Sequence, residues 1–157
     1  MKPFLDSHEN EHFPSKDTEI KCRVSVYALI KKGDSVLCIK EEGSDKWELP
    51  GGGVDAPETF VEALERECWE ETGYRVQMTS EQPLFAKQKR FYRTSTKDFW
   101  QGAEFIFATE LISEDQDLSV VEKNIGETIT HIEWIPLNEI TAKNTHHDFW
   151  LYLQTLK

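Results

Sequence analysis

The sequence predicts an α/β domain in which helices pack against a β-sheet. Three observations lead to this prediction. Short apolar runs rich in β-branched residues alternate with turn-like segments, which is typical of strands. A segment in the middle of the chain carries the start and stop signals of a helix. The last residues have the apolar spacing of a second helix that packs on a sheet.

The length and the composition indicate one globular domain. A chain of 157 residues can bury a core without disulfides or a structural metal. The chain has three cysteines, an odd number, and no CxxC motif joins any two of them: Cys22, Cys38 and Cys68. We therefore expect no disulfide framework and no zinc site, a reducing compartment, and three buried cysteines.

Charge and hydropathy narrow the classes of partner. No apolar run is long enough to cross a membrane, and the N-terminus lacks the apolar region of a secretory signal. We therefore expect a cytoplasmic protein without a membrane partner. The formal net charge of -11 argues against nonspecific binding of long nucleic acids, because that binding depends on Lys and Arg neutralising phosphates.

The first half of the chain predicts a sheet that begins with two strands. Residues 1–20 have no clear period and form an arm that is either loose or docked as a strand. Residues 24–30 (VSVYALI) and 35–40 (SVLCIK) predict two strands joined by the turn KKGD. Residues 41–53 (EEGSDKWELPGGG) predict a loop with at most a short strand at 46–49.

A helix over Phe60–Thr72 follows this loop. Thr59 and Glu62 have the spacing of a capping box, and Gly73 is placed as a left-handed stop. By helical phase, one stripe of this helix faces the sheet and consists of Val61, Leu64 and Cys68.

The second half of the chain predicts more strands and a final helix. Residues 83–92 and 99–111 predict two strands that flank the loop RTSTKD. A polar loop then extends to about Gly126, and residues 130–137 (THIEWIPL) predict another strand. Residues 148–156 (DFWLYLQTL) predict the helix that closes the chain.

The glutamates of the central helix have two interpretations. Glu67, Glu70 and Glu71 lie at i, i+3 and i+4, so their like charges crowd together on one face. A solvated acidic surface is the ordinary explanation for such a helix. A hard divalent cation would also relieve the repulsion, because Mg²⁺ prefers carboxylate and phosphate oxygens. Gly51 to Gly53 favour the second interpretation, since backbone amides of glycines approach anionic groups closely.

Residues 52–74 resemble the signature box of Nudix (MutT-like) hydrolases. The family pattern is Gly, five residues, Glu, seven residues, Arg-Glu, an apolar residue, any residue, Glu-Glu, any residue, Gly and an apolar residue. All its fixed positions match: Gly52, Glu58, Arg66, Glu67, Glu70, Glu71 and Gly73. Cys68 and Tyr74 depart from the usual aliphatic choice, which concerns packing. The resemblance extends from Lys21 to about Ile140.

The resemblance implies a mixed sheet sandwiched between helices, in one Nudix domain over residues 21–157. It implies hydrolysis of a pyrophosphate bond in a nucleoside diphosphate derivative, with Mg²⁺ or Mn²⁺ as cofactor. Glu67, Glu70 and Glu71 would be metal ligands, one carboxylate would help to deprotonate water, and Arg66 would orient the carboxylates. The residues on the substrate side would be Gly51, Gly52, Gly53 and Glu58.

Two candidate elements lie outside the box. Family members use a further carboxylate, for which Glu127 is the first candidate, before Glu122 and Glu104; the alternative is a solvated loop residue. The segment 87–100 is basic and aromatic in an acidic chain, so Arg90, Tyr92 and Arg93 are candidates for substrate recognition. The alternative is an exposed edge hairpin whose cations prevent aggregation. His146 and His147 are interpreted as surface or capping residues, because adjacent side chains diverge.

Two other functional classes remain open. One is a Nudix-like module that binds a nucleotide without turnover, although such a module has no need for a complete glutamate set. The other is an isomerase of isoprenoid diphosphates, which needs a reactive cysteine. The identity of the nucleoside diphosphate derivative and the oligomeric state, a homodimer included, are left open by the sequence.

Overall fold

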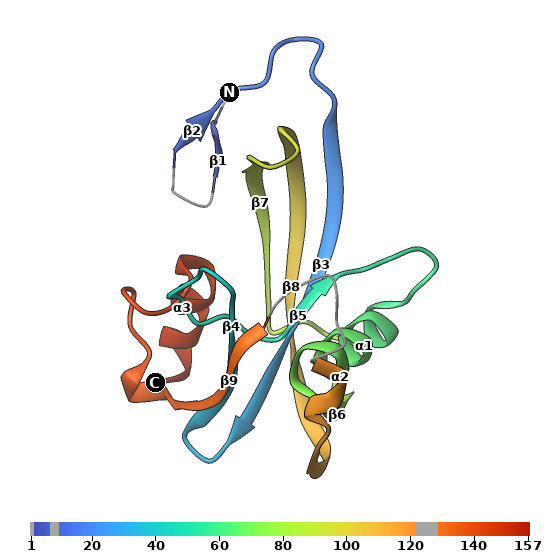
Figure 1. Cartoon of the computed structure of the whole chain (residues 1–157), viewed down its shortest axis with the longest axis vertical. Helices are drawn as coiled ribbons and strands as arrows, with labels where there is room; N and C mark the ends of the chain where they lie inside the picture. The colour runs from blue at the N-terminus through green and yellow to red at the C-terminus, as the bar shows by residue number, and fades with distance from the viewer. Residues whose placement is uncertain (1, 7–9, 122–128) are drawn as a thin grey trace.

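The computed structural model describes residues 2–6, 10–121 and 129–157 (Figure 1). Its first strands are β1 (Phe4–Leu5), β2 (Glu11–His12), β3 (Ile20–Lys32), β4 (Ser35–Glu41) and β5 (Gly51–Gly53). Then follow α1 (Phe60–Thr72), β6 (Tyr74–Met78), β7 (Phe85–Arg93), β8 (Asp98–Gln116) and α2 (Leu118–Val121). The chain closes with β9 (Ile129–Pro136), η1 (Leu137–Glu139), α3 (His147–Leu153) and η2 (Gln154–Leu156).

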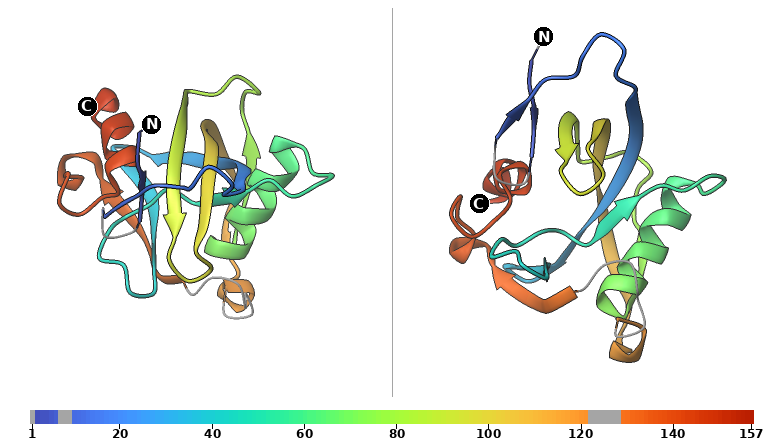
Figure 2. Two further views of the ribbon diagram at one scale, coloured as in Figure 1. Left: turned by 90° about the horizontal axis from the view of Figure 1, so that it is seen from above. Right: turned by 45° about the horizontal axis from the view of Figure 1, so that its top comes forward.

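The strands form a mixed sheet in the order β2-β1-β7-β8-β3-β4-β9, with β5 paired to β3 and β6 paired to β8. The β3–β8 and β1–β7 pairs are parallel, and the other pairs are antiparallel. Helices α1 and α3 lie on opposite sides of this sheet (Figure 2). The expected mixed sheet between helices is therefore confirmed.

Alternation along β3 builds a core on each face of the sheet. Val26, Ala28 and Ile30 pack in one cluster with Leu64 and Cys68 of α1. Leu29 belongs to a second cluster, which includes Phe149, Tyr152 and Leu153 from the C-terminal helix. Because side chains of a strand alternate between its two faces, one strand supports both helices.

Local signals determine helix α1 as predicted. The Thr59 hydroxyl accepts from the Glu62 amide at 3.3 Å, and the Glu62 carboxylate accepts from the Thr59 amide at 2.8 Å. These reciprocal bonds satisfy amide groups that the first turn leaves free. Gly73 ends the helix with φ of 69°. In the expected sheet-facing stripe, Leu64 and Cys68 are buried and Val61 is half-buried.

Several elements differ from the sequence-based expectation. The glycine run is a strand, β5, paired with β3, and β6 follows directly after Gly73 where no strand was expected. Helix α2 lies within the stretch predicted as a polar loop. Strand β8 extends to Gln116, five residues beyond the expected end at Leu111. The arm is docked rather than loose, because Leu5 pairs with Phe91.

The expectation of three buried cysteines is wrong for one of them. Cys38 and Cys68 are buried, but Cys22 is exposed. The physical reason is the length of β3, which begins at Ile20 and so carries Cys22 beyond the part of the strand that is buried in the α1-side core.

No helix in the described ranges combines the length and the apolarity that a bilayer-spanning segment requires.

Replacing Gly73 by alanine should destabilise the fold more than the same change at Gly33. Both glycines have positive φ, 69° and 60°, which costs an L-residue about 1–2 kcal/mol. At Gly73 an added Cβ would also lie 2.4 Å from the Asp117 carbonyl oxygen, whereas nothing lies within 4 Å at Gly33. We expect Gly73→Ala to lose at least about 1 kcal/mol more in urea unfolding, as overpacking does. Equal losses would show that the αL conformation alone decides.

Candidate active site

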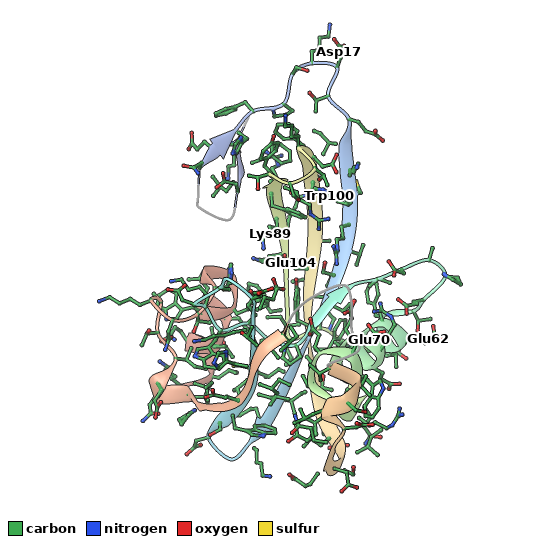
Figure 3. The ribbon with its side chains drawn as sticks, in the orientation of Figure 1. Asp17, Glu62, Glu70, Lys89, Trp100 and Glu104 are labelled. Atoms are coloured by element: carbon green, nitrogen blue, oxygen red, sulfur yellow. The ribbon has the colours of Figure 1, made fainter. Side chains whose placement is uncertain are left out.

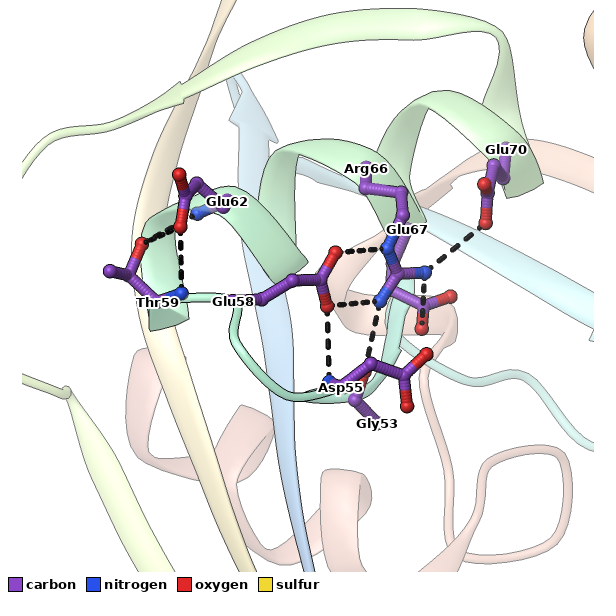
Figure 4. A network of polar contacts seen from close by, with 8 residues as sticks. All are labelled: Gly53, Asp55, Glu58, Thr59, Glu62, Arg66, Glu67 and Glu70. Atoms are coloured by element: carbon purple, nitrogen blue, oxygen red, sulfur yellow. Dashed lines mark hydrogen bonds and ion pairs between the residues drawn. The ribbon is translucent and has the colours of Figure 1, made fainter.

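The residues of the Nudix-like box converge on the guanidinium of Arg66 in helix α1 (Figure 4). Two of its nitrogens bind Glu58, with Nε 2.6 Å from Oε1 and Nη2 2.8 Å from Oε2. Nη1 lies 2.9 Å from Glu67 Oε1 and 3.2 Å from Glu70 Oε2. Nη2 also donates to the Gly53 carbonyl at 3.1 Å. One side chain therefore joins the helix to the glycine strand.

The loop before the helix holds Glu58 in its ionised form. Besides the bidentate pair with Arg66, its carboxylate accepts from the Asp55 amide at 3.1 Å. The hydrogen bonds from Arg66, and then that from Asp55, lower the pKa of Glu58 to about 2. Its hydrogen bonds to Glu58 in turn raise the pKa of Arg66. Both groups therefore remain charged at neutral pH.

Glycine is required where the glutamates meet β5. The Glu71 side chain is buried, and its Oε2 accepts from the Gly51 amide at 2.7 Å. A Cβ on Gly52 would lie 2.6 Å from the Glu67 carboxyl carbon. Any larger residue at position 52 would therefore displace this carboxylate, and the absence of a side chain leaves a cradle beside it.

The structure thus brings together the predicted box residues Gly51, Gly52, Gly53, Glu58, Arg66, Glu67, Glu70 and Glu71. Of the additional carboxylates, Glu104 alone lies within the described residues. Glu127 and Glu122 lie outside the described residues. Glu104 is buried in β8 and pairs with Lys87 Nζ at 3.1 Å and Lys89 Nζ at 3.3 Å.

The predicted recognition residues of the hairpin divide into two groups. Arg90 and Tyr92 contact the N-terminal arm: Arg90 lies 5.8 Å from the Phe4 ring centroid, and Tyr92 stacks on His12 at 4.0 Å. The guanidinium of Arg93 instead lies 5.5 Å from the ring centroid of Trp100. A role of all three in substrate binding stays a prediction.

Of the paired histidines, the structure describes the side chain of His146. His146 precedes α3 at the N-cap position but makes no capping hydrogen bond with its side chain. Its Nε2 lies 3.3 Å from Glu48 Oε1, and its side chain is 41% exposed. The interpretation of His146 as a surface residue agrees with this exposure.

Two of the three thiols are unsuited to nucleophilic chemistry. Burial raises the pKa of Cys38 to about 12 and also raises the pKa of Cys68. A thiolate is the reactive form of cysteine, so an isomerase mechanism would have to use Cys22.

A divalent cation fits the donor set of the box, although no metal-ligand cluster of three or more His, Cys, Asp or Glu residues is preformed in the described ranges. Instead, Arg66 Nη1 bridges Glu67 and Glu70, while Glu71 binds Gly51. One guanidinium faces three carboxylates, including Glu58. Two of their negative charges are left uncompensated by Arg66, and oxygen ligands are the kind that Mg²⁺ and Mn²⁺ prefer.

A cleft of about 620 Å³ adjoins the box, and the sequence did not reveal it. Gly53, Asp55 and Glu58 line one side, and Arg23 and Trp100 line the other. Arg23 is recognisable as a cleft residue only once the pairing of β3 with β5 is known. This pairing joins segments distant in sequence, and the glycine run carries no local signal for it. In the sequence, Trp100 is one of several aromatic residues of the segment 87–100.

Comparisons with known proteins identify the family of this chain. Residues 21–154 match the NUDIX domain family. An RNA pyrophosphohydrolase of Psychrobacter sp. is 50% identical over 38 residues, which cover 24% of this chain and 22% of that protein. Phosphatase NudJ of Escherichia coli K12 is 31% identical over 93 residues, covering 58% and 56%. The matched segments thus span less than two thirds of either relative.

A solved structure shows the same fold. The NUDIX hydrolase from Nitrosomonas europaea superposes with a TM-score of 0.63 at 22% identity, over 86% of this chain and 87% of that one.

The Glu58–Arg66 pair should make stability depend on acid pH. Glu58 has a pKa of about 2 in the folded protein against 4.5 as the reference, so its contribution is complete above pH 4.5 and is lost as the pH falls toward 2. Urea unfolding between these pH values should show a smaller decline for Glu58→Gln than for the native chain. Glu133→Gln, at an exposed position of β9, serves as the control. An unchanged pH slope in Glu58→Gln would argue against the pair.

Proposed function

The chain belongs to the NUDIX family, and from this premise we propose that it hydrolyses the pyrophosphate bond of a nucleoside diphosphate linked to another group, with Mg²⁺ or Mn²⁺ as cofactor. The observation that carries the proposal is the array of carboxylates that Arg66 collects beside the glycine strand. An acidic surface without a site would have its carboxylates spread into solvent. Here Glu67 and Glu71 point instead at the backbone of β5.

We assign the cation to Glu67, Glu70 and Glu71. When bound, the cation would neutralise charge on the phosphoryl oxygens and so allow an acidic protein to accept a diphosphate. The three carboxylates come from one rigid helix, which is capped at both ends by Thr59 and Gly73. Sites on such elements hold their geometry better than sites on loops.

The remaining groups of the box position the water and the substrate. A carboxylate, Glu67 or Glu70, would accept a proton from the attacking water as the new P–O bond forms and the bridging P–O bond breaks. Arg66 contacts both carboxylates and therefore sets their orientation. Gly51, Gly52 and Gly53 would let the diphosphate approach the backbone, and Glu58 would hold Arg66 in place.

The relatives support the reaction class more than the substrate. One of them is named as an RNA pyrophosphohydrolase and the other as a phosphatase. The substrate we propose is a small nucleotide derivative. A nucleotide-binding module without turnover is the competing function, and it is disfavoured because it would not need ionised carboxylates held this close together.

Purified protein should release the products of pyrophosphate cleavage from at least one member of a panel of nucleoside triphosphates, nucleotide sugars and dinucleoside polyphosphates in Mg²⁺. Glu67→Gln and Glu70→Gln should each lower kcat by about 10²–10⁴-fold, the range for loss of a proton acceptor. Glu65→Gln, on the same helix but outside the fixed positions of the box, should retain activity. Native turnover in both Glu67→Gln and Glu70→Gln would contradict the assigned roles, and binding without turnover in the native chain would favour the regulatory module.

Metal binding should be measurable without any substrate. A ligand that binds only the folded state stabilises it by about 2.7 kcal/mol at a concentration of 100 Kd. Millimolar Mg²⁺ or Mn²⁺ should therefore raise the Tm of the native chain, and EDTA should reverse the rise. Glu70→Gln should reduce the shift, whereas Glu65→Gln should preserve it. No shift in the native chain with either metal would count against the cation site.

A further inference from the structure

The cleft beside the box lies along an unpaired edge of β3. Strand β5 pairs with residues Ser25 to Tyr27, and the Val54 amide extends this contact to the Val24 carbonyl. From Ile20 to Arg23, the described part of the sheet pairs β3 with β8 alone. The loop that leads to α1 therefore separates from β3 and leaves the cleft of about 620 Å³, a volume within the usual range for small-ligand sites.

Gly53 connects this cleft to the candidate active site. A Cβ on Gly53 would lie 2.6 Å from both Nε and Nη2 of Arg23, so the guanidinium lies directly against the glycine. The carbonyl oxygen of the same glycine accepts from Arg66 at 3.1 Å. Gly53 thus lies between Arg23 and the hydrogen-bond network of Arg66. It forms no ion pair with a carboxylate in the described ranges.

Trp100 also lines this cleft. Its indole Nε1 is shielded from solvent and has no hydrogen-bond acceptor among the described residues. A buried donor without an acceptor is uncommon in folded proteins and points to a missing partner. Figure 3 shows Trp100 on the extended part of the sheet, beyond Lys89 and Glu104 and away from Glu70 of α1.

The surroundings of Trp100 are positively charged in an otherwise acidic protein. Arg93 lies 5.5 Å and Lys21 Nζ 5.4 Å from its ring centroid. Lys21 is paired with Asp98 at 2.8 Å, which leaves the charges of Arg23 and Arg93. On the opposite wall, Glu58 is engaged by Arg66 and Asp55 carries a negative charge. Positive charge is therefore concentrated on the β3 side of the cleft.

We propose that Arg23 binds phosphate oxygens of the substrate that lie beyond the pyrophosphate bond to be cleaved. The inference rests on the proposed function and deepens it, because it selects nucleoside polyphosphates over nucleotide sugars. A guanidinium fork matches phosphate geometry. A neutral sugar in this position would leave the charge of Arg23 without a counter-charge.

The first test measures binding without catalysis. Isothermal titration calorimetry with inorganic tripolyphosphate and with inorganic pyrophosphate, each in Mg²⁺, compares Arg23→Gln and Trp100→Phe with the native chain. We expect affinity for tripolyphosphate to fall about tenfold in Arg23→Gln, the scale of one charged hydrogen bond, and to stay unchanged in Trp100→Phe, because the indole nitrogen is shielded from the cleft. Affinity for pyrophosphate should stay unchanged. Lys31→Gln at an exposed position of β3 and Trp134→Phe on β9 are the matched controls.

The second test compares substrates. Arg23→Gln should raise KM for a nucleoside triphosphate or a dinucleoside tetraphosphate with little change in kcat, and KM for a nucleotide sugar should stay the same. Equal effects on both substrate classes, or no effect on either, would overturn the proposal. If circular dichroism shows that Arg23→Gln does not fold, the same measurements are made on Arg23→Lys. Lysine keeps the charge but loses the bidentate hydrogen-bonding geometry of the guanidinium. Calorimetry needs no turnover. If the protein hydrolysed none of the substrates, the proposed function would be refuted, and the binding result would still test the role of Arg23.

Discussion

The bidentate contact between Arg66 and Glu58 is the interaction on which the site depends. Glu58 belongs to the loop before α1, and Arg66 lies two turns into the helix. Their contact closes the loop onto the helix and places the Gly53 carbonyl against the same guanidinium. Nη1 of Arg66 contacts the carboxylates of Glu67 and Glu70 and so determines how they are oriented. Without Glu58, the guanidinium would lose the contact that holds it between the loop and the carboxylates of Glu67 and Glu70.

This arrangement explains how a helix tolerates so many like charges. Carboxylates at i, i+3 and i+4 repel one another, and burial of Glu71 increases the cost of its charge. The protein places positive charge and backbone donors at the same points, through Arg66 and the Gly51 amide. The compensation is incomplete, and that incompleteness is what suits the site to a cation.

Local sequence signals predicted the elements whose causes are local. Helix α1 begins after Thr59 and ends before Gly73 as expected, because its capping residues and its αL stop act within a few residues. Strands β5 and β6 were missed, since each depends on a partner distant in sequence. Glycine has a low strand propensity, yet β5 is held by pairing with β3 at a place where a Cβ on Gly51 would lie 2.1 Å from the Val26 carbonyl oxygen. A local motif identifies the glutamates of the box. No such motif identifies Arg23 and Trp100, because only the pairing of distant strands brings them beside the box.

The docked arm has a consequence for the outer edge of the sheet. Strand β1 covers β7, and Phe4 is 1% exposed against Phe99 at 5.2 Å. An uncovered strand edge is a template for pairing with another chain. Strand β1 thus shields the part of the β7 edge around Phe91. On this side of the sheet the outermost strand is β2, which is only two residues long and offers few backbone groups to a neighbouring molecule.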